Sequence, residues 1–113
     1  MAATISRNEL KQAIDTGSVT VVETLGAEHY AQGHLPGAIH IHFEQVADRA
    51  PELLPDKNAA IVTYCSNTAC RNSEIAAGEL IKLGYTDVRK YAEGKQDWQD
   101  AGLPLETTIP ETV

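Results

Sequence analysis

Long hydrophobic runs are missing from this chain of 113 residues, and basic residues are few. No apolar stretch approaches the roughly 20 residues that a membrane-spanning helix needs, so we expect no membrane partner. Nine lysines and arginines against 16 aspartates and glutamates give a formal net charge of −7 at pH 7. This balance argues against a general surface for nucleic acid or for an anionic membrane. A small, local positive pocket remains compatible with it.

Cysteines are also scarce, because the chain contains only Cys65 and Cys70. Two cysteines so close in sequence make a poor disulfide framework for a domain of this size. The segment 1–7 has none of the apolar character of a secretory signal. We therefore predict a cytoplasmic protein whose thiols are reduced.

The overall composition is that of an ordinary globular domain, with 42% hydrophobic and 22% charged residues. A chain of this length can bury a core without disulfide bonds. No repeat or low-complexity linker divides it. We predict one domain over residues 1–105 and a C-terminal tail over residues 106–113, which has little to bury.

Strand-like and helix-like segments alternate along the chain. Ser6 and Glu9 have the spacing of a capping box at the start of a first helix. A helix that begins at Phe43 is expected to end before Pro51. The alternation predicts an α/β domain with a mainly parallel sheet, in which ligands bind beyond the carboxyl ends of the strands. The predicted strands are 19–23, 38–41, 60–64 and 88–91, and the predicted helices are one that starts at Ser6, 27–32, 43–50, 74–83 and a last one that includes 97–101.

The most informative segment surrounds Cys65. An apolar, β-prone run over residues 60–64 leads into this cysteine, Arg71 follows six positions later, and the helical pattern of residues 74–83 comes next. A strand, a short loop and a helix N-terminus aim backbone N–H groups at one place, which favours an anion. The pKa of the Cys65 thiol should therefore fall and its nucleophilicity should rise. A cysteine after a buried strand can also be an inert core residue.

Histidines raise the question of a metal site. His40 and His42 lie on one face of an extended segment. Two histidines without a clear third ligand are weak evidence for zinc, so we predict no metal. His34 is more simply explained as a hydrogen-bonded structural residue.

Three stretches of the chain resemble segments of the rhodanese-like family, in the same order and at the same spacing. They are residues 30–39, residues 64–71 and residues 91–104. The resemblance implies a three-layer α/β/α fold with a five-stranded, mainly parallel sheet. It also implies a sulfurtransferase in which Cys65 accepts a sulfane sulfur from a donor such as thiosulfate, carries it as a persulfide and passes it to a thiol or to cyanide. Such an enzyme needs no cofactor.

The chain departs from the family pattern at three places. Residues 23–25 read Glu-Thr-Leu where the family usually has Asp-Val-Arg, and Glu93 stands where a glycine is common. Five residues separate Cys65 from Arg71, whereas sulfurtransferases of the family usually have four. The longer spacing resembles the phosphatases and arsenate reductases of the same fold. The five intervening residues are Ser66, Asn67, Thr68, Ala69 and Cys70.

The leading hypothesis makes Cys65 the nucleophile and the persulfide carrier. The N–H groups of residues 66–71 would stabilise its anion, and Arg71 would orient an anionic donor. Cys70 is either a redox partner that resolves a persulfide or sulfenic acid on Cys65, or a small apolar residue that faces inward. The sulfur could also pass to a partner protein in a relay.

Two alternatives remain. The chain could be a non-catalytic or redox-sensing module that binds a partner protein. It could also be an oxyanion enzyme of the phosphatase or arsenate-reductase type. Phosphoryl transfer needs a proton donor for the leaving group, for which Glu23 and Asp97 are candidates by position only.

Overall fold

A computed structural model describes residues 3–107. The strands are β1 (Ala3–Thr4), β2 (Thr20–Glu23), β3 (Ile39–His40), β4 (Ala60–Tyr64) and β5 (Asp87–Tyr91). The helices are α1 (Arg7–Asp15), α2 (Ala27–Gln32), α3 (Val46–Leu53), α4 (Asn72–Lys82) and α5 (Gly94–Asp100), and a 3-10 turn, η1 (Phe43–Gln45), precedes α3. The five strands form one parallel sheet in the order β1-β5-β4-β2-β3.

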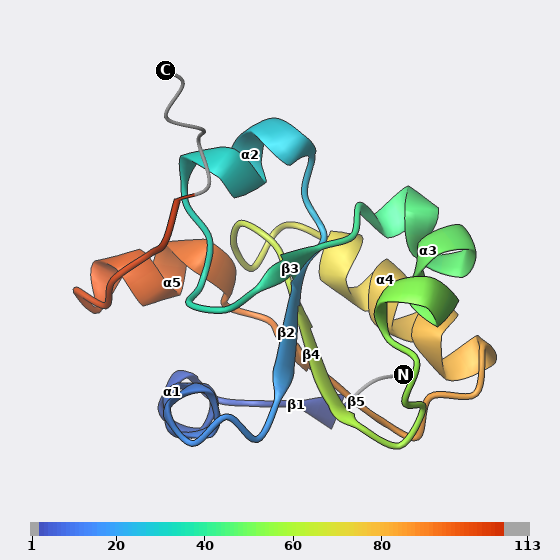
Figure 1. The fold of residues 1–113 in the computed structure, drawn as a ribbon. Helices are drawn as coiled ribbons and strands as arrows, with labels where there is room; N and C mark the ends of the chain where they lie inside the picture. Colours follow the sequence, from blue (N-terminus) through green and yellow to red (C-terminus); the bar gives the residue numbers. More distant parts are fainter. Residues whose placement is uncertain (1–2, 108–113) are drawn as a thin grey trace.

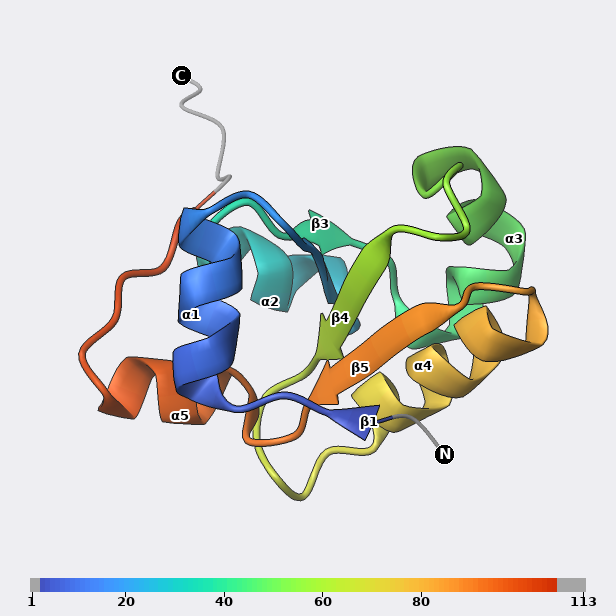
Figure 2. The same cartoon turned by 90° about the horizontal axis from the view of Figure 1, so that it is seen from below.

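Helices cover both faces of this sheet. Figures 1 and 2 show α1 and α5 on one side and α3 and α4 on the other. The three-layer α/β/α fold predicted from the sequence is therefore confirmed. β1 was not predicted, because two residues carry no periodicity, yet it extends the sheet by pairing with Arg89 and Lys90 of β5.

The predicted end of the helix before Pro51 is wrong. The helix expected to end before Pro51 continues through it, and α3 closes with a hydrogen bond from the Leu54 N–H to the Ala50 carbonyl. Proline has a helical φ and costs this short helix one backbone hydrogen bond. Because Ala50 and Leu54 are both buried against the sheet, packing holds the helix in place on either side of Pro51.

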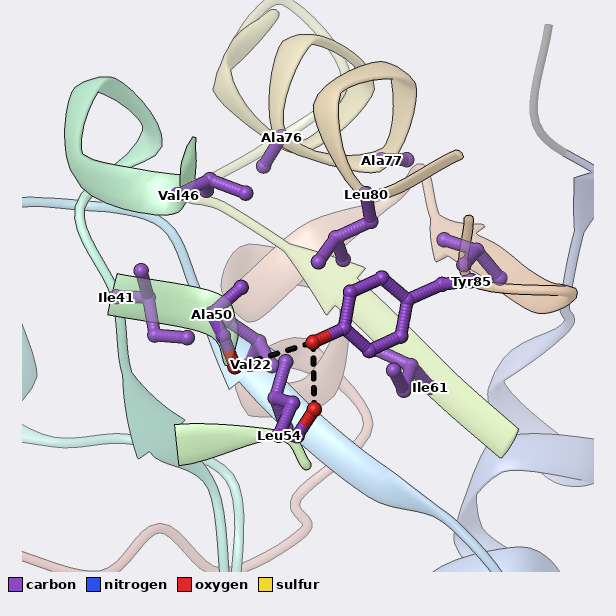
Figure 3. Close-up of a cluster of buried hydrophobic side chains, with 11 residues drawn as sticks. Val22, Ile41, Val46, Ala50, Leu54, Ile61, Ala76, Ala77, Leu80 and Tyr85 are labelled. Carbon is purple, nitrogen blue, oxygen red and sulfur yellow. Dashed lines mark hydrogen bonds between the residues drawn. The ribbon is translucent and has the colours of Figure 1, made fainter. Parts of the chain in front are cut away.

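The core has two halves, one on each face of the sheet. Figure 3 shows the half beneath α3 and α4, where the Tyr85 hydroxyl donates to the carbonyls of Ala50 and Leu54 at 3.1 and 2.5 Å. Tyr91 and Trp98 lie in the other half of the core. Between them the two halves anchor β4, the central strand of the sheet.

His34 is a structural residue, as predicted. Its ring is buried and stacks on Tyr30 at a centroid distance of 3.9 Å, and its Nδ1–H donates to the Tyr30 carbonyl at 2.9 Å. The backbones of His34 and Glu106 exchange two hydrogen bonds, so the chain is still paired at the first residue of the predicted tail. The rest of that tail, from residue 108 on, lies outside the described residues.

Residues 3–107 contain neither a membrane-spanning helix nor a cluster of metal ligands. None of the helices there is both long enough and apolar enough to cross a bilayer. In the same part of the chain, no three histidine, cysteine, aspartate or glutamate side chains are grouped so that they could hold a metal ion.

Candidate functional site

Cys65 lies at the carboxyl end of the central strand β4, where the sequence placed it. The loop that follows leads into α4, so strand, loop and helix N-terminus have the predicted order. The thiol is nonetheless covered, with only 1% of the residue exposed. Its Sγ lies 3.4 Å from the carbonyl oxygen of Cys70 and 3.7 Å from the hydroxyl oxygen of Ser73. The candidate nucleophile is therefore beneath the loop rather than open to solvent.

Burial reverses the predicted ionisation of this cysteine. The pKa of the Cys65 thiol is raised, chiefly because its thiolate would lose hydration and also because of its hydrogen bonding with Cys70. The backbone and hydroxyl of Ser73 favour the thiolate but do not outweigh burial. The prediction of a lowered pKa is wrong. It considered the favourable effect of the helix N-terminus on the thiolate, but not the hydration that a buried thiolate loses.

For Cys70, the effects that lower the pKa of the thiol outweigh those that raise it. Burial raises the pKa of its thiol as well, but hydrogen bonding with Cys65 and from the backbone of Asn72 favours the thiolate. The backbone N–H and the hydroxyl of Ser66 act in the same direction, and the resulting pKa is lowered. Of the N–H groups that the sequence assigned to Cys65, that of Ser66 favours the thiolate of Cys70 instead. Both cysteines are free.

The loop between the two cysteines folds back through Asn67. Its side-chain Oδ1 accepts the N–H of Ala69 at 2.9 Å, and its carbonyl accepts the N–H of Cys70 at 3.1 Å. Asn67, Thr68 and Ala69 are exposed. This turn brings the Cys70 carbonyl oxygen to within 3.4 Å of the Cys65 sulfur.

A hollow of about 270 Å³ opens beside this loop. Cys70 and Arg71 line it, whereas Cys65 does not. Arg71 is exposed, and within residues 3–107 its guanidinium makes no hydrogen bond or ion pair. Lys90 also lines the hollow, but its Nζ lies 2.6 Å from the Glu74 carboxylate. Arg71 is thus available to attract an anion to a hollow in which Cys70 is the accessible thiol. The other lining residues are Thr68, Ala69, Ser73, Glu74 and Ala92.

The two carboxylates considered as proton donors have other partners. Glu23 is fully buried, and it accepts a hydrogen bond from the Tyr64 hydroxyl at 2.6 Å and pairs with Lys95 at 3.0 Å. Asp97 pairs with Arg7 at 2.9 Å and accepts a hydrogen bond from the Tyr91 hydroxyl at 2.5 Å. Neither carboxylate hydrogen-bonds the loop of residues 66–71, so neither is placed there as the proton donor that phosphoryl transfer needs.

Sequence reasoning missed the residues that support the loop from α5. The N–H of Lys95 donates to the Cys65 carbonyl, and the N–H of Gln96 donates to the Ser66 carbonyl, both at 2.8 Å. Gly94, at a φ of 71°, lies directly against the same backbone. The third family-like stretch was the available signal, but it does not reveal which atoms these residues contact. Ser73, beneath Cys65, was missed as well.

The two thiols should differ in reactivity. At pH 7, we expect iodoacetamide to alkylate Cys70 at least about fivefold faster than Cys65, because only the thiolate reacts and Cys70 has the lower pKa and the greater exposure. Alkylation of Cys65 should accelerate only as the pH rises beyond about 8.5, the value of a free thiol. Peptide mass mapping over time measures both rates. Faster labelling of Cys65 at pH 7 would contradict the described geometry.

Comparisons with known proteins agree with this fold. The chain is 34% identical over 109 residues to the HTH-type transcriptional regulator Rv0324 of Mycobacterium tuberculosis, and the match covers 94% of this chain and 46% of the regulator. It is 40% identical over 70 residues to the thiosulfate sulfurtransferase PspE of Escherichia coli, which covers 62% of this chain and 64% of PspE. The chain thus spans about half to two thirds of these relatives.

A solved structure and a family model extend the comparison. The crystal structure of the BH2092 protein from Bacillus halodurans superposes with a TM-score of 0.86 at 28% identity, over 95% of this chain and 78% of that one. The model of the rhodanese-like domain matches residues 6–101, which is most of the chain. This chain belongs to the rhodanese-like domain family.

Proposed function

We propose that this domain is a sulfurtransferase that moves a sulfane sulfur from an anionic donor such as thiosulfate to a thiol or cyanide acceptor. The observation that carries the proposal is the position of Cys65, which ends the central strand of a rhodanese-like domain and is followed by a loop that leads into a helix N-terminus. The relative named as a thiosulfate sulfurtransferase supports the same class of reaction.

In the proposed reaction, the Cys65 thiolate attacks the outer sulfur of thiosulfate. A bond forms between the two sulfur atoms, the bond to the sulfonate sulfur breaks, and sulfite leaves. Arg71 supplies the charge that draws the dianion into the hollow beside the loop. Because Cys65 is almost fully covered, the donor reaches it when the exposed residues 67–69 move aside. The loop N–H groups then stabilise the persulfide anion.

The proposal is tested by the intact mass of the protein after incubation with thiosulfate. Cys70→Ser, which keeps only the carrier thiol, should gain about 32 Da, one sulfur atom, and Cys65→Ser should gain nothing, because the carrier thiol is missing. Cyanide should remove the added sulfur as thiocyanate. A Cys70→Ser protein without a sulfur adduct would overturn the proposal.

A second candidate function is a redox-responsive module that binds a partner protein. Two observations favour it: the carrier thiol is covered, and the relative Rv0324 is a transcriptional regulator of which this chain spans less than half. Such a module would form a sulfur adduct or a disulfide once, without turnover. Thiocyanate production that continues over many cycles would favour the enzyme, whereas production that stops after one equivalent would favour the module.

A further inference from the structure

Cys65 and Cys70 are in contact, although only one thiol is needed for the proposed sulfur transfer. The Sγ of Cys65 lies 3.4 Å from the carbonyl oxygen of Cys70. The turn at Asn67 holds this arrangement. A thiol beside a persulfide can attack it, so the contact has chemical consequences as soon as Cys65 carries sulfur.

The environments of the two cysteines suit different roles. Cys65 is 1% exposed, so a persulfide on it is shielded from bulky acceptors. Cys70 lines the hollow beside the loop and is partly exposed. Hydrogen bonds from Ser66 and Asn72 lower the pKa of the Cys70 thiol, so it has the larger thiolate fraction at neutral pH. Cys70 is therefore the attacking group, and the sulfur bound to Cys65 is the target.

Resting on the sulfurtransferase function proposed above, we infer that Cys70 resolves the persulfide of Cys65, closing a Cys65–Cys70 disulfide and releasing hydrosulfide. The Cys70 thiolate attacks the Sγ of Cys65, a bond forms between the two cysteine sulfurs, and the bond to the sulfane sulfur breaks. The sulfane sulfur leaves with the electron pair and is reduced, while the two cysteines are oxidised.

This step specifies the class of acceptor. The disulfide must be reduced before the next cycle, and a dithiol does so by two successive exchanges that leave the dithiol oxidised. Thiosulfate and a dithiol are then converted to sulfite, hydrosulfide and the cyclic disulfide of the dithiol. The natural acceptor of this domain is therefore a small or protein dithiol that reaches Cys70 through the hollow.

The experiment follows one turnover without air. Reduced wild type, Cys70→Ser and Cys65→Ser are mixed with thiosulfate, and the released sulfide is measured. Each protein is then denatured and alkylated, and its intact mass is determined by mass spectrometry. The wild type should lose about 2 Da, escape alkylation and release about one sulfide per chain, as disulfide closure requires. Cys70→Ser should keep an added sulfur, with sulfide release reduced at least about tenfold. Cys65→Ser should remain unchanged.

The other outcomes separate the two proposals. A wild type that keeps its added sulfur as long as Cys70→Ser does would overturn this inference and leave the sulfurtransferase standing. An added sulfur on Cys65→Ser would make Cys70 the carrier and overturn the assigned order. No sulfur on any of the three proteins would overturn the proposed function itself. Cys70→Ala, which should match Cys70→Ser, guards against an effect specific to the serine hydroxyl.

Discussion

Replacing Lys95 with methionine should lower the free energy of unfolding by about 3–5 kcal/mol, the usual cost of leaving a buried charge without its partner. Glu23 is fully buried, and its carboxylate lies 3.0 Å from the Lys95 ammonium. That ammonium also donates to the carbonyl of His29 at 3.1 Å. Methionine fills much of the same space, so the loss is mainly electrostatic. Urea denaturation followed by circular dichroism measures it.

Two controls separate this interaction from a general effect of removing a lysine. Lys11→Met removes an exposed pair with Asp15 and should cost only about 0–1 kcal/mol. The double variant Glu23→Gln/Lys95→Met removes both charges and should recover at least about half of the loss, because no uncompensated charge remains. A cost for Lys95→Met that equals the cost for Lys11→Met would show that the pair contributes little to stability.

The Glu23–Lys95 pair also explains one departure from the family pattern. The family usually has an arginine where this chain has Leu25, close to the acidic residue that ends the second strand. Here a lysine from α5, 72 positions away from Glu23, provides a positive charge for that carboxylate. Sequence spacing reveals the missing arginine, but only the fold reveals where another cation approaches.

Local patterns predicted the elements well because their causes are local. Ser6 and Glu9 form the predicted capping box, in which the Ser6 hydroxyl accepts the Glu9 N–H and the Glu9 carboxylate accepts the Ser6 N–H, both at 3.2 Å. The predicted strand over residues 60–64 has the same bounds in the structure. Local sequence patterns contain no information on three-dimensional packing, and it is this packing that lets α3 continue through Pro51.

The ionisation of the site could not be predicted for the same reason. The spacing of Cys65 and Arg71 placed both in one loop, which the structure bears out. The pKa of each thiol, however, depends on how much water the folded loop excludes and on which sulfur its N–H groups reach. Those quantities are set by the turn at Asn67 and by the contact of α5 with the loop.

Replacing Gly94 with alanine should destabilise the domain by about 3 kcal/mol or more and abolish sulfur transfer. A Cβ at this position would lie 2.7 Å from the carbonyl oxygen of Cys65 and 2.8 and 2.9 Å from backbone atoms of Ser66 and Asn67. Backbone atoms cannot rotate aside as a side chain can, so the loop must shift. The left-handed φ of 71° adds about 1–2 kcal/mol, and overpacking adds about 1–3 kcal/mol.

Gly102 provides the matched control for this prediction. Its φ of 79° is also left-handed, but a Cβ there would meet no atom within 4 Å. Gly102→Ala should therefore cost only the backbone strain and leave sulfur transfer intact. Comparing the urea midpoints of both variants, and their thiosulfate-dependent mass gain when Cys70 is also replaced by serine, isolates the contact with the loop. Equal effects of the two substitutions would mean that the close approach of Gly94 does not hold the loop of Cys65 in position, since of these two glycines only Gly94 touches that loop.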